Sequence, residues 1–286
     1  MKGIIFSFLF LSSQVLIAQG GSDIFSFTLE VKGDKLSLSN KKQLTKRSGY
    51  DNQPHFVGNN AIYYASTNDS GLTDIYYRDL SNSTESQLTN TYLSSEYSPT
   101  PTPDGQFISC IRQGSDGSQN LVKYPVKGGG ATVLIDNHLV GYHIWLDDNT
   151  ILCFILNDKS NDLHLFYLNS GRERVLAKNI GRCFKHIPGS QSVSFVQLNK
   201  DGSADIKSLD HKSLEINLIT KSIEGIQDYA WVDADNMVLV NKSILHQWNR
   251  KNGWVKQLNL QEHGLTAVSR IAINNSANKI VMVADE

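Results

Sequence analysis

The sequence is poor in cysteine and has no excess of charge of either sign. It holds three cysteines among 286 residues, and its formal net charge is -1. The cysteines are scattered, with no Cys-x-x-Cys pair, which excludes the common zinc-finger spacings and a disulfide framework. We therefore expect Cys110, Cys153 and Cys183 to be unpaired, with Cys110 and Cys153 acting as small buried hydrophobes. Without a basic excess, the sequence gives no sign of a nucleic-acid partner.

Helical periodicity and the commonest catalytic motifs are absent as well. No stretch keeps apolar residues at 3.6-residue spacing over two turns, so a helical repeat protein is excluded. The sequence contains no G-x-S-x-G nucleophile elbow and no phosphate-binding glycine loop. These absences exclude the usual serine-hydrolase domain and the P-loop nucleotide sites.

A long apolar run is found only near the amino terminus. Lys2 precedes apolar residues 4–11, and a second short apolar run, 15–18, ends at Ala18. A basic residue, an interrupted apolar stretch and a small residue at its end are typical of a signal peptide, and the stretch is short for a membrane span. We predict a signal peptide over residues 1–18, followed by a single domain over 19–286. The protein is then exported, periplasmic or secreted, with no membrane insertion after cleavage.

The mature sequence is a repeat with a period of 42 to 45 residues. Each unit has a bulky residue before a turn rich in Gly, Asn or Asp, and these residues are Phe56, Pro101, Trp145, Ile187, Trp231 and Ile273. Short β-rich segments follow each turn, and Asp104-Gly105 is a strong hairpin signal. Four short strands per period of this length predict the blades of a β-propeller.

The sixth unit ends after two strands, and the missing two are found at the other end of the chain. Segments 23–29, 36–38 and 42–45 have strand character and precede the first complete unit. We predict that they complete the last blade, because this pairing closes the ring and covers exposed edges. The predicted fold is all-β: a six-bladed β-propeller of four-stranded antiparallel blades, the last one closed by the N-terminal strands.

The repeat resembles a known family. Asp74-Ile75-Tyr76 followed by Gln87-Leu88-Thr89, the matching Gln43-Leu44-Thr45, and Pro103-Asp104-Gly105 are similar to the TolB-type propeller repeat. Unlike TolB, this chain is expected to have no separate N-terminal α/β domain. The resemblance implies an exported bacterial propeller, expected to be monomeric, that binds partners at the mouth of its channel.

Candidate site residues come from the segments that begin each innermost strand, because these segments meet at one mouth of a propeller channel. Each segment offers a polar or ionisable side chain, and the predicted ligand-binding set is Asp51, Glu96, Tyr142, His143, Arg182, His186, Asp228 and Arg270. We predict a non-enzymatic protein that binds a protein, peptide or glycan partner there. No catalytic residue, metal or cofactor is assigned. The competing interpretation is that loops are polar for ordinary reasons of solvation.

An enzymatic alternative uses the same residues. His143 or His186 would act as general base, Asp228 would orient it, and Arg182 or Arg270 would hold an anionic group. The reaction would be a lyase or hydrolase step, with or without the help of a metal ion, on a carbohydrate or another small substrate. Geometry separates the two interpretations. A histidine nitrogen, a carboxylate and a guanidinium that face one cavity within hydrogen-bond reach would favour the enzyme, and pairing of these groups with backbone groups would disfavour it.

A metal site at the mouth would require three histidines from different blades. His55, His143 and His186 are the candidates, with Gln53 nearby. His143 stands two residues before the bulky residue of its unit, whereas the other two stand one residue before theirs. Strict alternation along a strand then directs His143 away from the other two. Buried, hydrogen-bonded histidines are the simpler interpretation.

Overall fold

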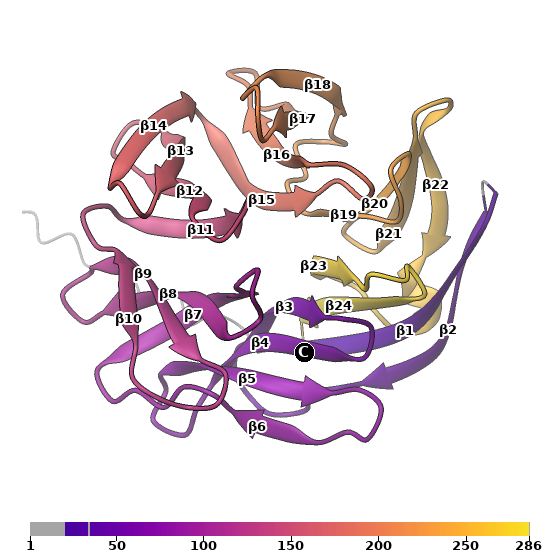
Figure 1. The fold of residues 1–286 in the computed structure, drawn as a ribbon. Coiled ribbons are helices and arrows are strands. Elements are labelled where there is room, and N and C mark those ends of the chain that lie inside the picture. Colours follow the sequence, from indigo (N-terminus) through magenta and orange to yellow (C-terminus); the bar gives the residue numbers. More distant parts are fainter. Residues whose placement is uncertain (1–20, 34, 286) are drawn as a thin grey trace, which may run out of the picture.

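Six four-stranded antiparallel sheets form a ring in the computed structural model, which describes residues 21–33 and 35–285 (Figure 1). The predicted signal peptide lies outside these residues. Blade 1 consists of β3 (Asp51–Val57), β4 (Ala61–Thr67), β5 (Thr73–Asp79) and β6 (Glu85–Gln87). Blade 2 consists of β7 (Ser94–Pro101), β8 (Phe107–Gly114), β9 (Gln119–Pro125) and β10 (Thr132–Ile135). Blade 3 consists of β11 (Val140–Trp145), β12 (Thr150–Leu156), β13 (Asn161–Tyr167) and β14 (Arg172–Ala177).

The remaining blades repeat this order, and the last one joins the two ends of the chain. Blade 4 consists of β15 (Ile180–His186), β16 (Ser192–Leu198), β17 (Ala204–Asp210) and β18 (Ile216–Lys221). Blade 5 consists of β19 (Tyr229–Trp231), β20 (Asn236–Asn241), β21 (Ile244–Asn249) and β22 (Gly253–Asn259), followed by the 3-10 helix η1 (Leu260–His263). Blade 6 consists of β23 (Val268–Ile273), β24 (Lys279–Asp285), β1 (Ser22–Lys32) and β2 (Lys35–Gln43). The predicted six-bladed propeller and its closure are confirmed.

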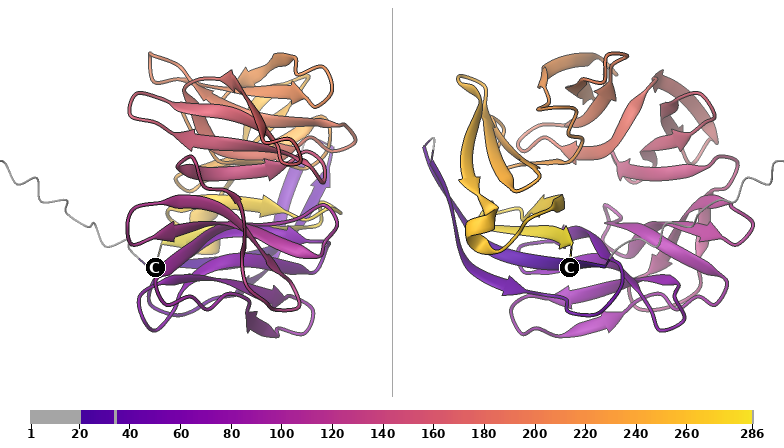
Figure 2. Two further views of the ribbon diagram at one scale, coloured as in Figure 1. Left: turned by 60° about the vertical axis from the view of Figure 1, so that its left-hand side comes forward. Right: turned by 180° about the vertical axis from the view of Figure 1, so that it is seen from behind.

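Closure depends on the pairing of β1 with β24, which lie side by side in Figures 1 and 2. The register runs from Ser22 opposite Asp285 to Thr28 opposite Lys279. β1 therefore carries the third-strand position of blade 6, and β2 carries the fourth. The backbone groups of β24 find partners on both sides, so no inner edge of this blade is left open.

The Asp-Ile and Gln-Leu-Thr elements of the repeat form one hydrogen-bonded corner. In blade 1, the Thr89 hydroxyl donates to Asp74 (2.9 Å) and accepts from the Ile75 amide (2.8 Å), while Gln87 donates to Asp74 (3.0 Å). In blade 6, Thr45, Asp23, Ile24 and Gln43 make the same three bonds. The motif recurs because each side chain satisfies a buried polar group of its partner strand.

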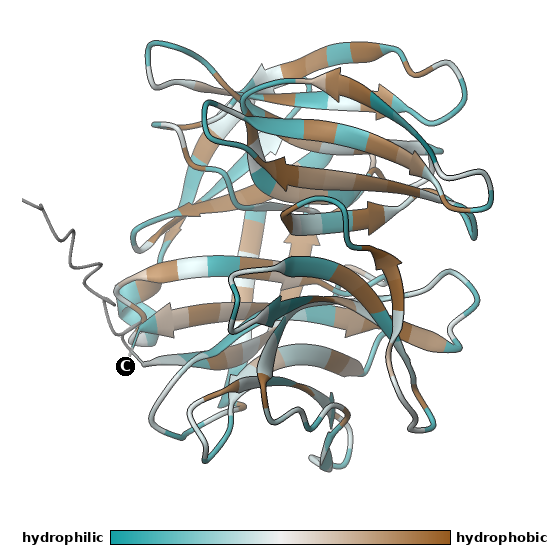
Figure 3. Ribbon diagram, turned by 90° about the vertical axis from the view of Figure 1, so that its left-hand side faces the viewer, coloured by the Kyte–Doolittle hydropathy of each residue, from teal (hydrophilic) through white to brown (hydrophobic). Residues whose placement is uncertain are grey.

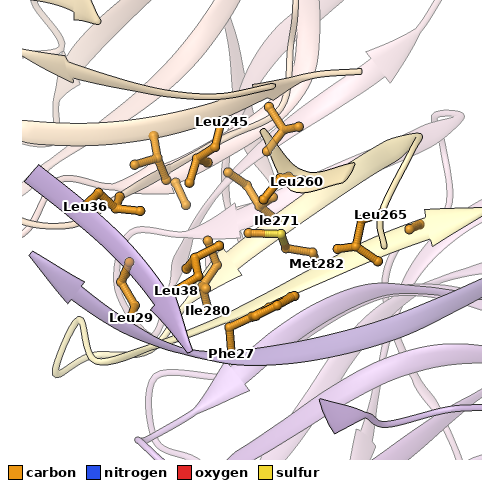
Figure 4. Packing of buried hydrophobic residues seen from close by; sticks show 14 residues of the cluster. Phe27, Leu29, Leu36, Leu38, Leu245, Leu260, Leu265, Ile271, Ile280 and Met282 are labelled. Atoms are coloured by element: carbon orange, nitrogen blue, oxygen red, sulfur yellow. The ribbon is translucent and has the colours of Figure 1, made fainter. Parts of the chain in front are cut away.

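The hydrophobic core is divided among the blade interfaces. The described residues form six buried clusters, and each cluster combines residues of two neighbouring blades. Figure 4 shows the cluster between blades 5 and 6, where Phe27 and Leu38 from the N-terminal strands meet Leu245. Trp145 and Trp231 lie in two other clusters, with 5% and 6% of their surfaces exposed. Each blade therefore buries its apolar faces against the two blades beside it. Opening the ring would expose two of these faces, so ring closure contributes to the stability of the fold.

Hydrophobic segments occupy the strands, and hydrophilic residues gather in the turns (Figure 3). The three cysteines are free and buried, as predicted. Among the described residues, no helix is long and apolar enough to cross a membrane.

Candidate functional site

The innermost strands, β3, β7, β11, β15, β19 and β23, begin at one mouth of the channel, here called the proximal mouth, and end at the distal mouth. Five of them lose regular pairing near their start. The irregular steps lie between Asn52 and His55, Tyr97 and Thr100, Val140 and Tyr142, Ile180 and Phe184, and Val268 and Arg270. A bulge re-aims the side chains that follow it. The proximal mouth is therefore lined by residues that regular alternation would place elsewhere.

All six blades contribute to one cavity of about 90 Å³ at the proximal mouth. Five of the eight predicted site residues line it, namely Tyr142, His143, Arg182, Asp228 and Arg270. Two further hollows share Arg182 with this cavity, one beside Val240 and Lys242 and one beside Tyr97 and Phe154. Arg182 thus stands where the three spaces meet.

Arg270 of blade 6 is held in place by a residue of the neighbouring blade 5 and by a residue of blade 3 across the channel. Its guanidinium donates to the Tyr142 hydroxyl (2.9 Å) and lies 3.5 Å from an Asp228 oxygen. The other Asp228 oxygen accepts from the Ile271 amide at 3.0 Å. Burial alone lowers the pKa of Arg270, but Tyr142 and Asp228 raise it above its ordinary value, so the side chain is a fixed cation.

Arg182 differs from Arg270 because it has no acidic partner. No carboxylate in the described part of the chain lies within salt-bridge distance of its guanidinium, and its Nε is buried without a hydrogen-bond partner. Lys185 lines the same cavity, so three cationic side chains face one carboxylate, that of Asp228. This charge balance suits an anionic group, which an arginine can bind through two parallel hydrogen bonds.

Two glutamines fix the backbone of the proximal mouth across blade boundaries. Gln53 Oε1 accepts from the Ser98 amide (2.6 Å), and Gln227 Oε1 accepts from the Arg182 amide (3.1 Å). Gln53 and Ser98 both have a φ of 55°. Such strained conformations persist only where the surroundings hold them, and they cluster at functional sites.

His143 is tied to the neighbouring blade rather than to a carboxylate. Its Nε2 lies 2.7 Å from Ser109 Oγ, which donates to the Thr100 carbonyl and accepts from Trp145 Nε1 at 2.8 Å. Since the serine proton is already used, we assign the proton to His143 Nε2, which leaves its buried Nδ1 without a partner. Burial, and then the nearby His55, lower the pKa of His143 to about 3.

Three predicted site residues lie away from this cavity. Asp51 is buried and pairs with Arg47, and Glu96 is buried and accepts from Thr91 and Tyr124. His186 lines a separate hollow at the distal mouth. The expectation that all eight side chains converge on one pocket is therefore wrong for these three, because the inner strands turn them toward blade interfaces or the opposite mouth.

Other residues of the mouth were not in the predicted set. Lys185, Gln53 and Ser98 line the cavity, and Gln227 lines the adjoining hollows. All four lie in the segments that begin inner strands. The sequence therefore identified the segments that line the mouth, although not every residue in them. The bulges decide which side chain of each segment faces the channel, and no sequence pattern announces them.

The channel histidines do not assemble a metal site. His143 lines the proximal cavity and His186 the distal hollow, with His55 lining both, so no one space holds all three. Among the described residues, the one grouping with metal-ligand spacing is elsewhere, at His138, His164 and Glu173. His143, Asp228 and both arginines line one cavity, but Asp228 is bonded to a backbone amide and an arginine, so the histidine–carboxylate pair of the enzymatic interpretation is not formed.

Comparison with solved structures shows which known folds this chain resembles. A putative TolB from Agrobacterium tumefaciens superposes with a TM-score of 0.69 at 13% identity, over 93% of this chain and 99% of that one. The fold is that of a TolB-like propeller. TolB from Acinetobacter baumannii gives a TM-score of 0.60 at 11% identity over 92% of this chain, which spans 64% of that protein.

A propeller outside the TolB group is also similar. A chain of a nidogen/laminin complex gives a TM-score of 0.64 at 11% identity, with 92% of this TolB-like chain and 98% of that chain covered. No protein-family model matches the sequence, and no curated protein matches it. At these identities the likeness establishes the fold alone.

Proposed function

We propose that this TolB-like propeller is an exported, non-enzymatic binding protein whose proximal mouth receives an anionic group of a protein, peptide or glycan partner. Arg182 supports the proposal most directly. Its guanidinium stands where three hollows meet, without a carboxylate partner among the described residues. A cation left unpaired in a formed cavity has its strongest interaction available for a ligand.

The walls of the mouth suit a carboxylate attached to a larger molecule. Tyr50 and Tyr97 stack edge to face at 6.1 Å, and Tyr142 packs on Phe154 at 5.7 Å, beside the arginines. Aromatic and arginine side chains are typical of residues that supply most of the affinity at binding surfaces. Asp228 and Arg270 neutralise each other in part, which leaves Arg182 and Lys185 as the net positive charge.

The likeness to solved structures supports both export and partner binding in this proposal. Similar folds occur in proteins named TolB and in a chain of a complex between nidogen and laminin. Residues 1–18, as a signal peptide, would direct the chain to the periplasm or beyond it. A protein or glycan of the cell envelope would then be within reach of the mouth.

Calorimetry on the protein comprising residues 19–286 tests the proposal. The probes are a short glutamate-rich peptide, an oligogalacturonate, and a neutral oligosaccharide of equal length, and the variants are Arg182→Gln and the matched control Arg250→Gln. Arg250 is exposed and pairs with Asp235 far from the mouth. An acidic probe should bind the wild type and the control, and Arg182→Gln should weaken binding about 10- to 100-fold, as loss of a charge-assisted hydrogen bond does.

The probes separate the partner classes, and the variants separate a site from non-specific attraction. Binding of the peptide alone indicates a protein partner, and binding of the oligogalacturonate alone indicates an acidic glycan. Equal weakening by both substitutions, or no binding of either acidic probe, would overturn the proposal. Shortening of the oligogalacturonate during the assay, detected by mass spectrometry, would support the lyase or hydrolase alternative instead.

A further inference from the structure

A cluster of two histidines and a glutamate lies on the outer part of blade 3, away from the channel. His138 belongs to the connection between β10 and β11, His164 to the middle of β13, and Glu173 to the start of β14. The candidate ligand atoms of these residues all lie within 4.8 Å of one another. The cluster therefore joins the link between blades 2 and 3 to the two outer strands of blade 3.

The strand register explains why these side chains meet. Glu173 pairs with Phe166, and His164 stands two residues before Phe166 on the same face of β13. The Phe166 ring stacks on His164, with centroids 5.9 Å apart, and meets the His138 ring at 5.5 Å. Phe166 belongs to the buried cluster between blades 2 and 3, so the two imidazoles rest on a rigid apolar floor.

His164 has an unused nitrogen that faces the cluster. The residue is 6% exposed, and its buried Nδ1 has no hydrogen-bond partner. This atom lies 4.0 Å from Glu173 Oε2, and the same oxygen lies 2.7 Å from His138 Nε2. A buried polar atom without a partner is costly. The space between the three side chains is where a ligand for that atom would sit.

We propose that His138, His164 and Glu173 bind a divalent transition-metal ion, with Zn²⁺ as the best match. Two imidazole nitrogens and one carboxylate oxygen are a common zinc set, completed by water in the fourth position. Tetrahedral ligand atoms at zinc lie about 3.3 Å apart, so shifts of about 1 Å or less bring the three atoms into place. The ion replaces the hydrogen bond between His138 and Glu173 and gives His164 Nδ1 its partner.

Exposure and protonation both allow an ion to bind. The His138 and Glu173 side chains are 21% and 39% exposed, which leaves a path for the ion and its water. Burial, and then the neighbouring His138, lower the pKa of His164, which favours the neutral imidazole. The bound ion would fasten the connection between blades 2 and 3 to the outer strands of blade 3, and its binding would add to the stability of the folded ring.

The experiment measures zinc binding by protein lacking any affinity tag, after treatment with a chelator and dialysis. Equilibrium dialysis with elemental analysis, and thermal denaturation with and without ZnCl₂, are applied to the wild type, His138→Ala, Glu173→Gln and His211→Ala. His211 is the matched control, because it forms a partly buried pair with Asp147 at 3.1 Å without a third ligand among the described residues. Co²⁺ serves as a spectroscopic probe of coordination.

The wild type and His211→Ala should bind one Zn²⁺ per chain with a raised midpoint. His138→Ala and Glu173→Gln should weaken binding at least about tenfold, since even the loss of an outer partner of a ligand costs that much. Co²⁺ should give tetrahedral absorption bands that Zn²⁺ abolishes. No bound Zn²⁺ at micromolar concentrations, or equal weakening by His211→Ala, would overturn the proposal. Circular dichroism of each variant shows that it is folded, so a loss of binding is not a loss of structure.

Discussion

The contact between blades 2 and 3 and the contact between blades 4 and 5 are built on one plan. In both, a buried serine on the second strand donates to a carbonyl of its own blade and accepts from a tryptophan of the next blade. Ser109 bonds Trp145 at 2.8 Å, and Ser194 bonds Trp231 at 2.8 Å. The residue two positions before the tryptophan makes the third bond. It is His143 in the first contact and Tyr229 in the second, and both bonds are 2.7 Å long.

The two contacts differ in the polar atoms that the ring of the third residue still has free after it bonds the serine. The Tyr229 hydroxyl is the one polar atom of its ring, and the residue is fully buried away from the proximal cavity. His143 keeps a second nitrogen, Nδ1, and lines the cavity. The same scaffold position is thus inert in one interface and titratable in the other. Because Tyr229 makes the corresponding bond in a purely structural contact, the position of His143 beside the channel is weak evidence for a catalytic role.

Truncation of the tryptophans should give the largest effect. Trp145→Ala and Trp231→Ala should each lower the free energy of unfolding by about 3–5 kcal/mol, because each leaves a cavity and removes one hydrogen bond to a buried serine. Urea denaturation followed by circular dichroism measures the loss. The matched Trp→Phe variants keep most of the packing and should lose less. A cost below about 1 kcal/mol for either alanine variant would show that the two contacts are not equivalent.

Acid should distinguish the two contacts next. The pKa of His143 is about 3 in the folded protein and about 6.5 when unfolded, so the unfolded chain takes up the proton first as pH falls. The contribution of neutral His143 to the free energy of unfolding is fully present above pH 6.5 and is lost progressively between pH 6.5 and 3. About 2 kcal/mol of this contribution is lost at pH 5.

His143→Tyr copies the second contact into the first and should remove this part of the acid sensitivity. Urea denaturation of the wild type and the variant at pH 7.5 and pH 5 measures the difference. An unchanged pH dependence in the variant would mean that His143 is not the titrating group.

Removal of the serines tests the plan itself. Ser109→Ala and Ser194→Ala each leave a buried Trp N–H and a second donor without an acceptor, and each should cost about 1–3 kcal/mol. The two losses, measured by urea denaturation at pH 7.5, should agree within about 1 kcal/mol. A much larger loss at one site would show that the interfaces use their serines differently.

The smallest expected effect comes from the tyrosine. Tyr229→Phe removes one hydrogen bond and leaves Ser194 still paired with Trp231, so it should cost about 1 kcal/mol. Thermal denaturation at neutral pH detects such a change. A loss as large as that of Ser194→Ala would assign most of that contact to the tyrosine rather than to the tryptophan.

The propeller itself was readable in the sequence because each blade is a local unit. The spacing of Phe56, Trp145 and Trp231, and the repeated Gln-Leu-Thr ending at Thr45 and Thr89, record contacts that every blade must make with its own strands and with the next blade. Ring closure followed from counting strands, since an unpaired edge is costly.

The site was only partly readable, for a physical reason. The sequence located the segments that begin the inner strands, but it could not place each side chain. Glu96 is turned toward Thr91 and Tyr124 within its blade, and His186 is the last residue of β15 and so lies at the distal mouth. The serine networks join residues of different blades that are 34 to 37 positions apart, and His138 lies 26 positions before His164, so no local pattern shows these contacts. Local hydrogen bonding and hydrophobic spacing determine the blades, whereas which side chains meet between blades depends on strand register, twist and bulges, and only the tertiary structure decides those.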